Sequence, residues 1–320
     1  MGEVRVIDIG IPRGAPEAGL VGLSSRRVLR LVPARPRFAA PADTVLIVGG
    51  ARGATGAPAM AAEAAMRAGT CYVRVAVPAS VAPVMDLRLP EALIYGLEEE
   101  DGRHVEAGVS AIADLASKAG AVVLGPGLGG AEGAFLRAVG SSIEVPMVIE
   151  ADGLSAYPFA EAFYERPAPT VLISDEAGLG RLLRLSPEEV GARRLASARA
   201  LVDRTGAVVV LEGDGCVVAA PGGPVALGPG ASGALATNGT GSVLAGLVGT
   251  FLARGMDPFA AAAAAVLARS DAGDLAATRV GAGHTVAGDV IQALPEALAP
   301  RRDQAPSHDL RKIVRLWSDF

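Results

Sequence analysis

A glycine-rich turn that leads directly into an apolar run is the strongest candidate for chemistry in this chain. It reads Asn238-Gly239-Thr240-Gly241-Ser242 and is followed by an apolar segment that starts at Val243. Glycines leave backbone N–H groups uncovered at the start of a helix, where the helix dipole favours anions. The pattern predicts a phosphate-binding turn. Ser242 offers only a hydroxyl at its end, which is a poor proton acceptor and a good helix N-cap.

Three other glycine loops follow strand-like apolar runs. They lie in the segments 48–58, 124–129 and 149–154, and each begins where a β-like run ends. In open α/β sheets the loops at the carboxyl ends of parallel strands line the ligand crevice, and glycines let the backbone approach a ring or a phosphate closely. We therefore expect these loops to meet the phosphate turn in one site.

Composition excludes several classes of protein. The chain has 320 residues, of which 51% are hydrophobic and 20% charged, so it can bury a large core. A net charge of −5 argues against a nucleic-acid partner or an anionic membrane surface. Cys71 and Cys216 lie far apart and are read as small buried hydrophobes, so neither a disulfide framework nor a metal site is predicted. The longest apolar run, 259–268, is too short for a membrane span, and the predicted location is cytoplasmic.

Alternation of apolar runs with alanine-rich segments predicts an α/β fold with helices on both faces of a mainly parallel sheet. The strands are expected at 45–48, 72–77, 92–95, 121–124, 146–149 and 170–173. The helices are expected near 24–31, 58–68, 109–118, 131–139, 187–204, 243–254, 258–277 and 287–294. Short runs at 207–211, 216–220 and 224–227, separated by Gly-Asp-Gly and Pro-Gly-Gly, predict an antiparallel extension near residues 207–228.

The motifs occur together in an order that resembles one family. From about Asp43 to Leu298 the chain resembles the ADP- or ATP-dependent NAD(P)H-hydrate dehydratases, which have a ribokinase-like three-layer α/β/α fold. The resemblance rests on the four glycine-containing segments 48–58, 124–129, 149–154 and 236–246. Residues 4–12 also resemble the end of the epimerase domain that bifunctional members carry upstream. We therefore expect an N-terminal arm at 1–42, a dehydratase domain at 43–300 and a tail at 301–320.

The resemblance implies a role for individual residues. Substrate contacts are expected at Ala57, Gly125, Gly127, Asp152 and Asp175. Nucleotide contacts are expected at Glu212, Gly213, Asp214, Gly215, Cys216, Asn238, Gly239, Thr240 and Gly241. The family reaction is understood as phosphorylation of the substrate hydroxyl followed by loss of phosphate. Ser242 stands where the family has the Asp that activates this hydroxyl.

The chain departs from the family pattern mainly at polar positions. Glu212 replaces a lysine before the nucleotide hairpin, and Glu150 replaces the first Asp of an Asp-Ala-Asp motif. Two alternatives are open for Glu212, which either faces the phosphates or points to solvent. Asp152, Asp175 and Asp214 are candidates for a relocated base or are simply turn and cap residues. His104 and His308 are expected on the surface, and His284 in a structural role.

These departures leave three functions open. The first is ADP- or ATP-dependent dehydration of NAD(P)H hydrate with Mg²⁺, at full or reduced rate or with a relocated base. The second is a catalytically inactive homologue that keeps the nucleotide or dinucleotide pocket. The third is a small-molecule kinase of the same fold. The resemblance further implies a homo-oligomer, a tetramer or larger, and an epimerase partner encoded separately.

Overall fold

The computed structural model describes residues 21–38, 40, 42–130, 133–155, 166, 168–229 and 233–299. The strands are β1 (Val21–Leu23), β2 (Thr44–Val48), β3 (Tyr72–Pro78), β4 (Leu93–Leu97), β5 (Glu99–Glu100), β6 (Arg103–His104), β7 (Ala121–Leu124), β8 (Met147–Glu150), β9 (Thr170–Ser174), β10 (Val208–Leu211), β11 (Val217–Ala219) and β12 (Val225–Leu227). The α-helices are α1 (Gly56–Arg67), α2 (Ala82–Arg88), α3 (Val109–Ala116), α4 (Gly133–Ser142), α5 (Asp152–Ser155), α6 (Glu176–Leu183), α7 (Pro187–Ala192), α8 (Arg194–Thr205), α9 (Thr240–Ala253), α10 (Pro258–Val280) and α11 (Ala287–Leu298). Short 3₁₀ helices are η2 (Arg26–Leu31), η3 (Ala79–Val81), η4 (Glu106–Gly108), η6 (Gly233–Leu235) and η7 (Ala282–His284).

One large sheet runs through the described part of the chain in the order β1-β12-β11-β10-β9-β8-β7-β2-β3-β4. All neighbouring pairs are parallel except β10 with β11 and β11 with β12, which are antiparallel. The predicted mainly parallel sheet with an antiparallel extension near 207–228 is therefore confirmed. Strands β5 and β6 form a separate antiparallel pair.

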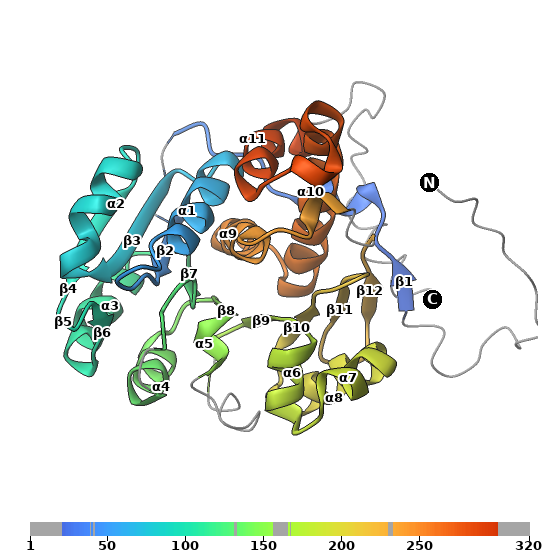
Figure 1. The fold of residues 1–320 in the computed structure, drawn as a ribbon, viewed down its shortest axis with the longest axis horizontal. Helices are drawn as coiled ribbons and strands as arrows, with labels where there is room; N and C mark the ends of the chain where they lie inside the picture. Colours follow the sequence, from blue (N-terminus) through green and yellow to red (C-terminus); the bar gives the residue numbers. More distant parts are fainter. Residues whose placement is uncertain are drawn as a thin grey trace, which may run out of the picture.

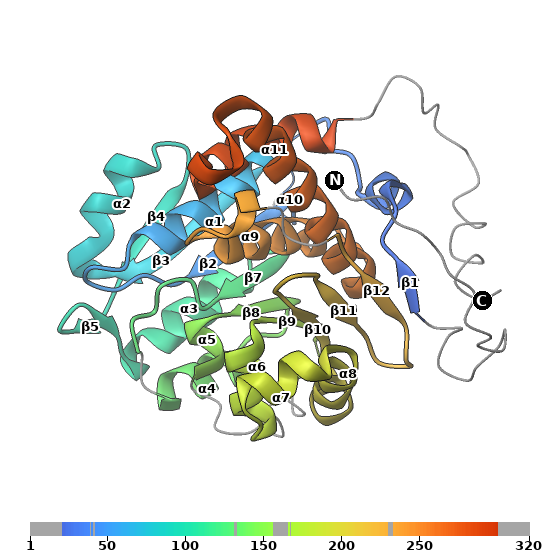
Figure 2. The ribbon, with the colours of Figure 1, turned by 45° about the vertical axis from the view of Figure 1, so that its right-hand side comes forward.

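Helices cover both faces of the sheet (Figure 1; Figure 2). Helices α1, α2, α9, α10 and α11 share one buried core with one face, and α3, α4, α6, α7 and α8 share a second core with the other. Along β2, Val45 and Ile47 belong to the first core while Leu46 and Val48 belong to the second. This alternation explains why the strands are apolar at every position, since both faces are covered.

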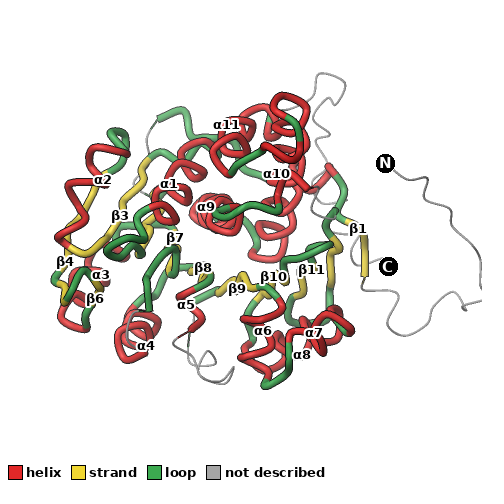
Figure 3. The backbone as a smooth tube through the Cα atoms, viewed as in Figure 1, coloured by secondary structure: helices red, strands yellow, loops and turns green. Residues whose placement is uncertain are grey.

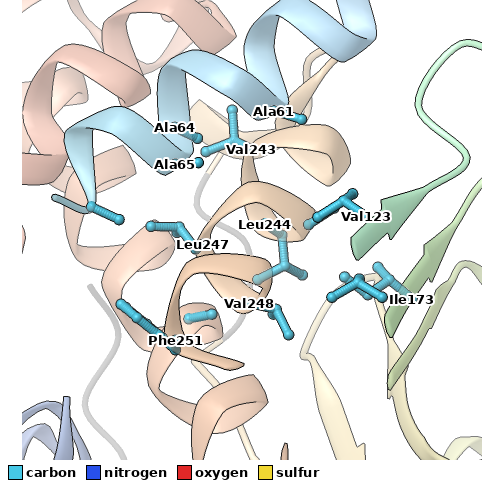
Figure 4. Close-up of a cluster of buried hydrophobic side chains, with 14 of the residues drawn as sticks. Ala61, Ala64, Ala65, Val123, Ile173, Val243, Leu244, Leu247, Val248 and Phe251 are labelled. Atoms are coloured by element: carbon cyan, nitrogen blue, oxygen red, sulfur yellow. The ribbon is translucent and has the colours of Figure 1, made fainter. Parts of the chain in front are cut away.

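Helix α9 lies in the middle of the first core, between α1 and the sheet (Figure 4). Ala61, Ala64 and Ala65 of α1 lie beside its apolar side chains, because small residues allow two helix backbones to approach closely. The approach is so close at Gly246 that an added Cβ would lie 2.2 Å from the carbonyl oxygen of Ala61. The contact fixes α9 relative to α1.

Figure 3 colours the backbone by secondary structure, and several of its elements differ from the sequence-based expectation. The helix expected at 187–204 is two helices, because the backbone of Arg193 leaves the helical region (φ −139°, ψ 43°) between α7 and α8. Helix α9 begins at Thr240, three residues before the predicted start, so the turn itself is helical. Helices α2, α5 and α6 were not predicted.

Residues assigned to an N-terminal arm contribute to the sheet. Strand β1 pairs in parallel with β12, with Gly22 opposite Ala226, and η2 lies where one short helix was expected. The epimerase-like segment 4–12 and the tail 301–320 lie outside the described residues, so the domain boundaries stay a prediction. Within the described part of the chain, no helix combines the length and apolar character needed to cross a membrane.

Candidate functional site

A cavity of about 670 Å³ opens at the carboxyl ends of the central strands. Its walls come from the loops after β2, β7, β8, β9 and β10 and from the turn before α9. Chain order reverses between the adjacent strands β2 and β7, and such a switch point is where open α/β sheets bind ligands. The lining residues are Gly53, Ala54, Gly56, Ala57, Met60, Gly127, Glu150, Ala151, Asp152, Asp175, Glu212, Thr237, Asn238, Gly239, Gly241 and Ser242.

The cavity gathers nine of the residues selected from the sequence. These are Ala57, Gly127, Asp152, Asp175, Glu212, Asn238, Gly239, Gly241 and Ser242. Gly125, Gly213, Asp214, Gly215, Cys216 and Thr240 do not line it. The Thr240 hydroxyl donates instead to the carbonyl oxygens of Leu235 (3.0 Å) and Thr237 (3.2 Å), which closes the turn from below. Which of these residues contact a ligand stays a prediction.

The phosphate-type turn exposes free backbone donors toward the cavity. Gly239 is the N-cap of α9 in the left-handed conformation (φ +95°), which favours glycine, and it has no side chain to cover the first turn. The first helical bond within α9 runs from the Val243 N–H to the Gly239 carbonyl. The N–H groups of the first three helical residues therefore have no partner inside the helix, as at any helix start.

Ser242 is not the N-cap that the sequence suggested. It is the third residue of α9, and its side chain is buried against the cavity wall with only 4% exposure. The helix starts earlier than expected because Gly239, at φ +95°, is the last residue outside the helical conformation. Ser242 therefore stands inside the first turn of the helix, beside the free donors.

Glu212 does not point freely to solvent. Its carboxylate forms an ion pair with Arg269 of α10, whose side chain is 5% exposed. The same guanidinium donates to the carbonyl oxygen of Thr240 (3.1 Å) and to Sγ of Cys216 (3.4 Å). Arg269 therefore ties the Glu212 loop to the start of α9, and it takes up the position of a structural cation beneath the phosphate turn.

The loop that follows Glu212 is held from its back. The guanidinium of Arg194 donates to the carbonyl oxygens of Leu211 (3.2 Å), Glu212 (2.9 Å) and Gly215 (2.7 Å), and it pairs with Glu176. Gly213 adopts φ +141°, a conformation that favours glycine, and an added Cβ would lie 2.6 Å from Nη1 of Arg194. The segment expected to contact the nucleotide is thus a rigid hairpin turn, not a free loop.

Two aspartates on the cavity wall have structural partners. Asp152 Oδ2 accepts a hydrogen bond from the Gly129 N–H (3.0 Å), which joins the loops after β7 and β8. Asp175 Oδ1 accepts from the Gly178 N–H (2.8 Å) and is the N-cap of α6. Asp214 lies outside the cavity. The turn-and-cap alternative describes the hydrogen bonds of both Asp152 and Asp175.

Glu150, at the end of β8, is the acidic residue that the sequence did not select. It is 7% exposed, and its Oε2 atom has no hydrogen-bond partner among the described residues. Burial raises its pKa to about 8, and the charges of Glu212 and Asp152 add to the shift. A Cβ added to Gly241 would lie 3.1 Å from Glu150 Oε1 and 3.1 Å from Glu212 Oε2, so both carboxyl groups converge on the phosphate turn.

The prediction that His104 lies on the surface is wrong. Its ring is buried and stacks on Phe135 with 5.2 Å between ring centroids, and Nε2 lies 2.9 Å from the Gly49 carbonyl oxygen. Burial lowers the pKa of His104, so the neutral ring that donates to Gly49 is favoured. The residues around His104 in the sequence are polar, which led to the surface prediction. The hairpin β5–β6 instead places the ring against the loop after β2. His284 belongs to η7 and is exposed, and His308 lies outside the described residues.

The cavity carboxylates do not form a metal centre by themselves. In the part of the chain that the structure describes, no group of three or more His, Cys, Asp or Glu side chains is arranged to hold a metal ion. The donor set therefore does not fit a cation held by protein ligands alone.

Comparison with known proteins gives a consistent result. The Carb_kinase family model, described as NAD(P)H-hydrate dehydratase, matches residues 45–296. The bifunctional NAD(P)H-hydrate repair enzyme Nnr of Salinibacter ruber is 38% identical over 319 residues, covering 94% of this chain and 58% of the relative. The ADP-dependent (S)-NAD(P)H-hydrate dehydratase of Xanthomonas campestris is 34% identical over 179 residues, covering 55% of this chain and 61% of the relative. The chain thus spans somewhat more than half the length of these relatives.

A solved structure supports the same fold. The ADP/ATP-dependent NAD(P)H-hydrate dehydratase from Bacillus subtilis, co-crystallised with ATP and Mg²⁺, is 25% identical to this chain. The two structures superpose with a TM-score of 0.73 over 86% of this chain and 96% of the other.

Proposed function

The chain belongs to the NAD(P)H-hydrate dehydratase family, and from this membership we propose that its cavity dehydrates NAD(P)H hydrate with the help of ADP or ATP. The observation that carries the proposal is the position of the phosphate-type turn. It opens into the same cavity as Ala57 and Gly127, two of the residues expected to contact the substrate.

The start of α9 suits a terminal phosphate for two reasons. Gly241 and Ser242 line the cavity while their N–H groups have no partner within the helix, so they can donate to phosphate oxygens. The 14-residue helix adds a partial positive charge of roughly half a unit at this end. Gly239 has no side chain that could cap the helix, and a capping side chain would compete with the phosphate for the same N–H donors.

The acidic residues of the cavity oppose an anionic ligand less than their number suggests. The charge of Glu212 is compensated by Arg269, and Glu150 is mainly protonated and neutral at pH 7 because its pKa is raised to about 8. Two carboxylates then remain, those of Asp152 and Asp175, and each already accepts a backbone hydrogen bond. The cavity can therefore admit phosphates beside a helix start.

The nucleotide is proposed to lie between this turn and the hairpin after β10. Arg194 holds that hairpin rigid through three carbonyl oxygens, which gives the nucleotide a preformed surface. The relative from Bacillus subtilis was crystallised with ATP and Mg²⁺, which supports the use of a nucleotide. Because the protein ligands alone do not fit a metal site, we assign Mg²⁺ no residue here.

A direct assay tests the proposal. Hydrated NADH is incubated with the chain, ADP and Mg²⁺, and recovery of the absorbance of reduced nicotinamide is followed, with ATP in a parallel reaction. We expect recovery that depends on both the protein and the nucleotide. A rate equal to that of a protein-free control would contradict the proposal.

Calorimetry with ADP and analysis of the products, run beside this assay, separate the two alternatives. A chain that binds ADP in calorimetry without recovering NADH would be an inactive homologue, for which the serine at position 242 is the supporting observation. A stable phosphorylated product without recovery would indicate a kinase. Assembly into a tetramer or larger and cooperation with a separate epimerase stay predictions, which light scattering and a coupled assay with both hydrate epimers can test.

A further inference from the structure

The cavity contains one buried carboxyl group without a structural role. Among the four acidic side chains that line it, Asp152 accepts from Gly129, Asp175 caps α6 and Glu212 pairs with Arg269. Glu150 keeps a buried oxygen, Oε2, with no hydrogen-bond partner among the described residues. An unpaired buried carboxyl oxygen is costly, so its retention in a ligand cavity indicates a partner that arrives with the ligand.

The backbone holds Glu150 firmly in this position. Ala151, the next residue, has φ +46°, a left-handed conformation that residues with a side chain rarely adopt. On the other side, a Cβ on Gly125 (φ +129°) would lie 1.8 Å from the carbonyl oxygen of Glu150. The backbone that carries Glu150 is therefore fixed by two tightly packed strand ends at the cavity.

Its other oxygen approaches the phosphate turn. Oε1 of Glu150 lies 3.1 Å from the point where a side chain on Gly241 would begin, directly beside Ser242 in the chain. A substrate hydroxyl that attacks a phosphate bound at this turn must approach the same place. Glu212 Oε2 lies equally near, at 3.1 Å, but that carboxylate pairs with Arg269, so Glu150 is the carboxyl group left to exchange a proton with that hydroxyl.

We propose that Glu150, at the end of β8, is the proton acceptor of the reaction. It takes the role for which the third residue of α9, Ser242, has no suitable group. The inference rests on the proposed function. The hydroxyl of the hydrated nicotinamide ring gives its proton to the Glu150 carboxylate, and the oxygen forms a bond to the terminal phosphorus of the nucleotide. The bond from that phosphorus to the bridging oxygen breaks, and the shortened nucleotide leaves with the electron pair. The C–O bond of the ring carbon then breaks, and phosphate leaves with its electron pair. The adjacent ring carbon gives up a proton to water, and the electron pair of that C–H bond forms the restored double bond.

The protonation state of Glu150 makes the proposal testable by pH. The charged groups that face it are Glu212 and Asp152, with Arg269 behind Glu212 and the start of α9 opposite. Because only the ionised form accepts a proton, kcat should fall roughly tenfold for each pH unit below the pKa of about 8. A side chain that serves only packing would not produce this slope.

The decisive variant is Glu150→Gln, compared with Glu144→Gln as a control. Glu144 is exposed and lies just before β8, outside the cavity. We expect Glu150→Gln to lower kcat by about 10²- to 10⁴-fold, the usual contribution of a general base, with ADP affinity in calorimetry unchanged or increased. In the double variant Glu150→Gln with Ser242→Asp, activity should return and the slope between pH 6 and 8 should disappear.

The outcomes separate this inference from the proposed function. If the unaltered chain recovers NADH and Glu150→Gln is as active as Glu144→Gln, the proton-acceptor role is wrong while the proposed function holds. If Glu150→Gln loses ADP binding to the same degree as activity, Glu150 is a binding residue and the inference is also overturned. If the unaltered chain binds ADP but never recovers NADH, the proposed function fails, and the role of Glu150 fails with it.

Discussion

Helix α9 has a buried charged cluster at each end, and the two clusters differ in how fully their polar atoms are paired. At its carboxyl end, Arg254 bonds both carboxylate oxygens of Asp43 and the carbonyl oxygens of Pro33, Ala68 and Gly69. At its amino end, Arg269 pairs with Glu212, yet Nε of Arg269 and Oε2 of Glu150 have no partner within the described residues.

This difference separates a structural cluster from a functional one. The cluster around Arg254 joins the start of β2 to the end of α1 and is complete without any ligand. The cluster around Glu150 opens into the cavity, where a ligand can complete its hydrogen bonds. Because unpaired buried groups cost free energy, removing charge should have opposite effects at the two ends.

The largest expected effect on stability is at the complete cluster. Asp43→Asn keeps the shape of the side chain but leaves Arg254 as an unbalanced buried charge. We expect a loss of about 3 to 5 kcal/mol in the free energy of unfolding, measured in denaturant at pH 7. Asp114→Asn, an exposed change in α3, serves as the control. Equal losses in the two variants would mean that the Arg254 cluster is not structural.

At the cavity end, neutralisation should stabilise the protein. The pKa of Glu150 is raised to about 8 in the folded state from an ordinary value of 4.5, so its contribution to stability is fully present below pH 4.5 and is lost as pH rises through 8. The glutamine of Glu150→Gln does not titrate. We therefore expect the free energy of unfolding of this variant to exceed that of the unaltered chain by about 3 kcal/mol at pH 7.

Unfolding curves of both proteins across this pH range check the sign. The two free energies should converge near pH 4.5 and separate towards pH 8. A variant less stable than the unaltered chain at pH 8 would show that Glu150 is paired and charged in the folded state.

Two glycines at the ends of α9 offer a smaller, matched comparison. Gly239 (φ +95°) precedes the helix and Gly255 (φ +77°) follows it, so alanine should cost about 1 to 2 kcal/mol of stability at either position. At Gly239 the added Cβ would also meet Sδ of Met60, at 2.4 Å, on the cavity wall.

Only Gly239→Ala should therefore weaken ADP binding, by roughly tenfold, equivalent to about 1.4 kcal/mol. Calorimetry with ADP on both variants makes the comparison. Equal ADP affinities in the two variants would argue against a phosphate at the start of α9.

The smallest expected effect is that of Ser242→Ala. The side chain of Ser242 does not cap α9, and Glu150 is the proposed proton acceptor. We expect the free energy of unfolding to change by about 1 kcal/mol or less, because serine and alanine differ by a single hydroxyl group. NADH recovery should stay close to that of the unaltered chain. A large loss of activity would show that Ser242, and not Glu150 alone, takes part in the reaction.

The sheet and the glycine loops could be predicted because their signals are local. Apolar runs fix the strands, and glycines at strand ends fix the loops that carry Gly127 and Gly239. The partners of the buried charges could not be predicted in the same way. Arg269 lies within an alanine-rich helix, 57 residues from Glu212, and nothing in its own segment indicates an ion pair.

Glu150 was read from the sequence as the loss of an aspartate. Only the folded chain shows that its longer side chain reaches towards Gly241 and lacks a partner for one oxygen. The start of α9 was misplaced for a related reason, because an apolar pattern marks the first buried residue and not the glycine that caps the helix.

The close contact of α1 and α9 at Ala61 and Gly246 also sets a dimension of the reaction. Both helices begin at the cavity, α1 beside the expected substrate contact Ala57 and α9 at the phosphate turn. Since their backbones touch, the first turns of the two helices are held as one unit. Helix packing then fixes the distance between the acceptor hydroxyl and the donor phosphate. The Glu212 loop is tied to the start of α9 through Arg269, so this wall of the cavity keeps the same spacing.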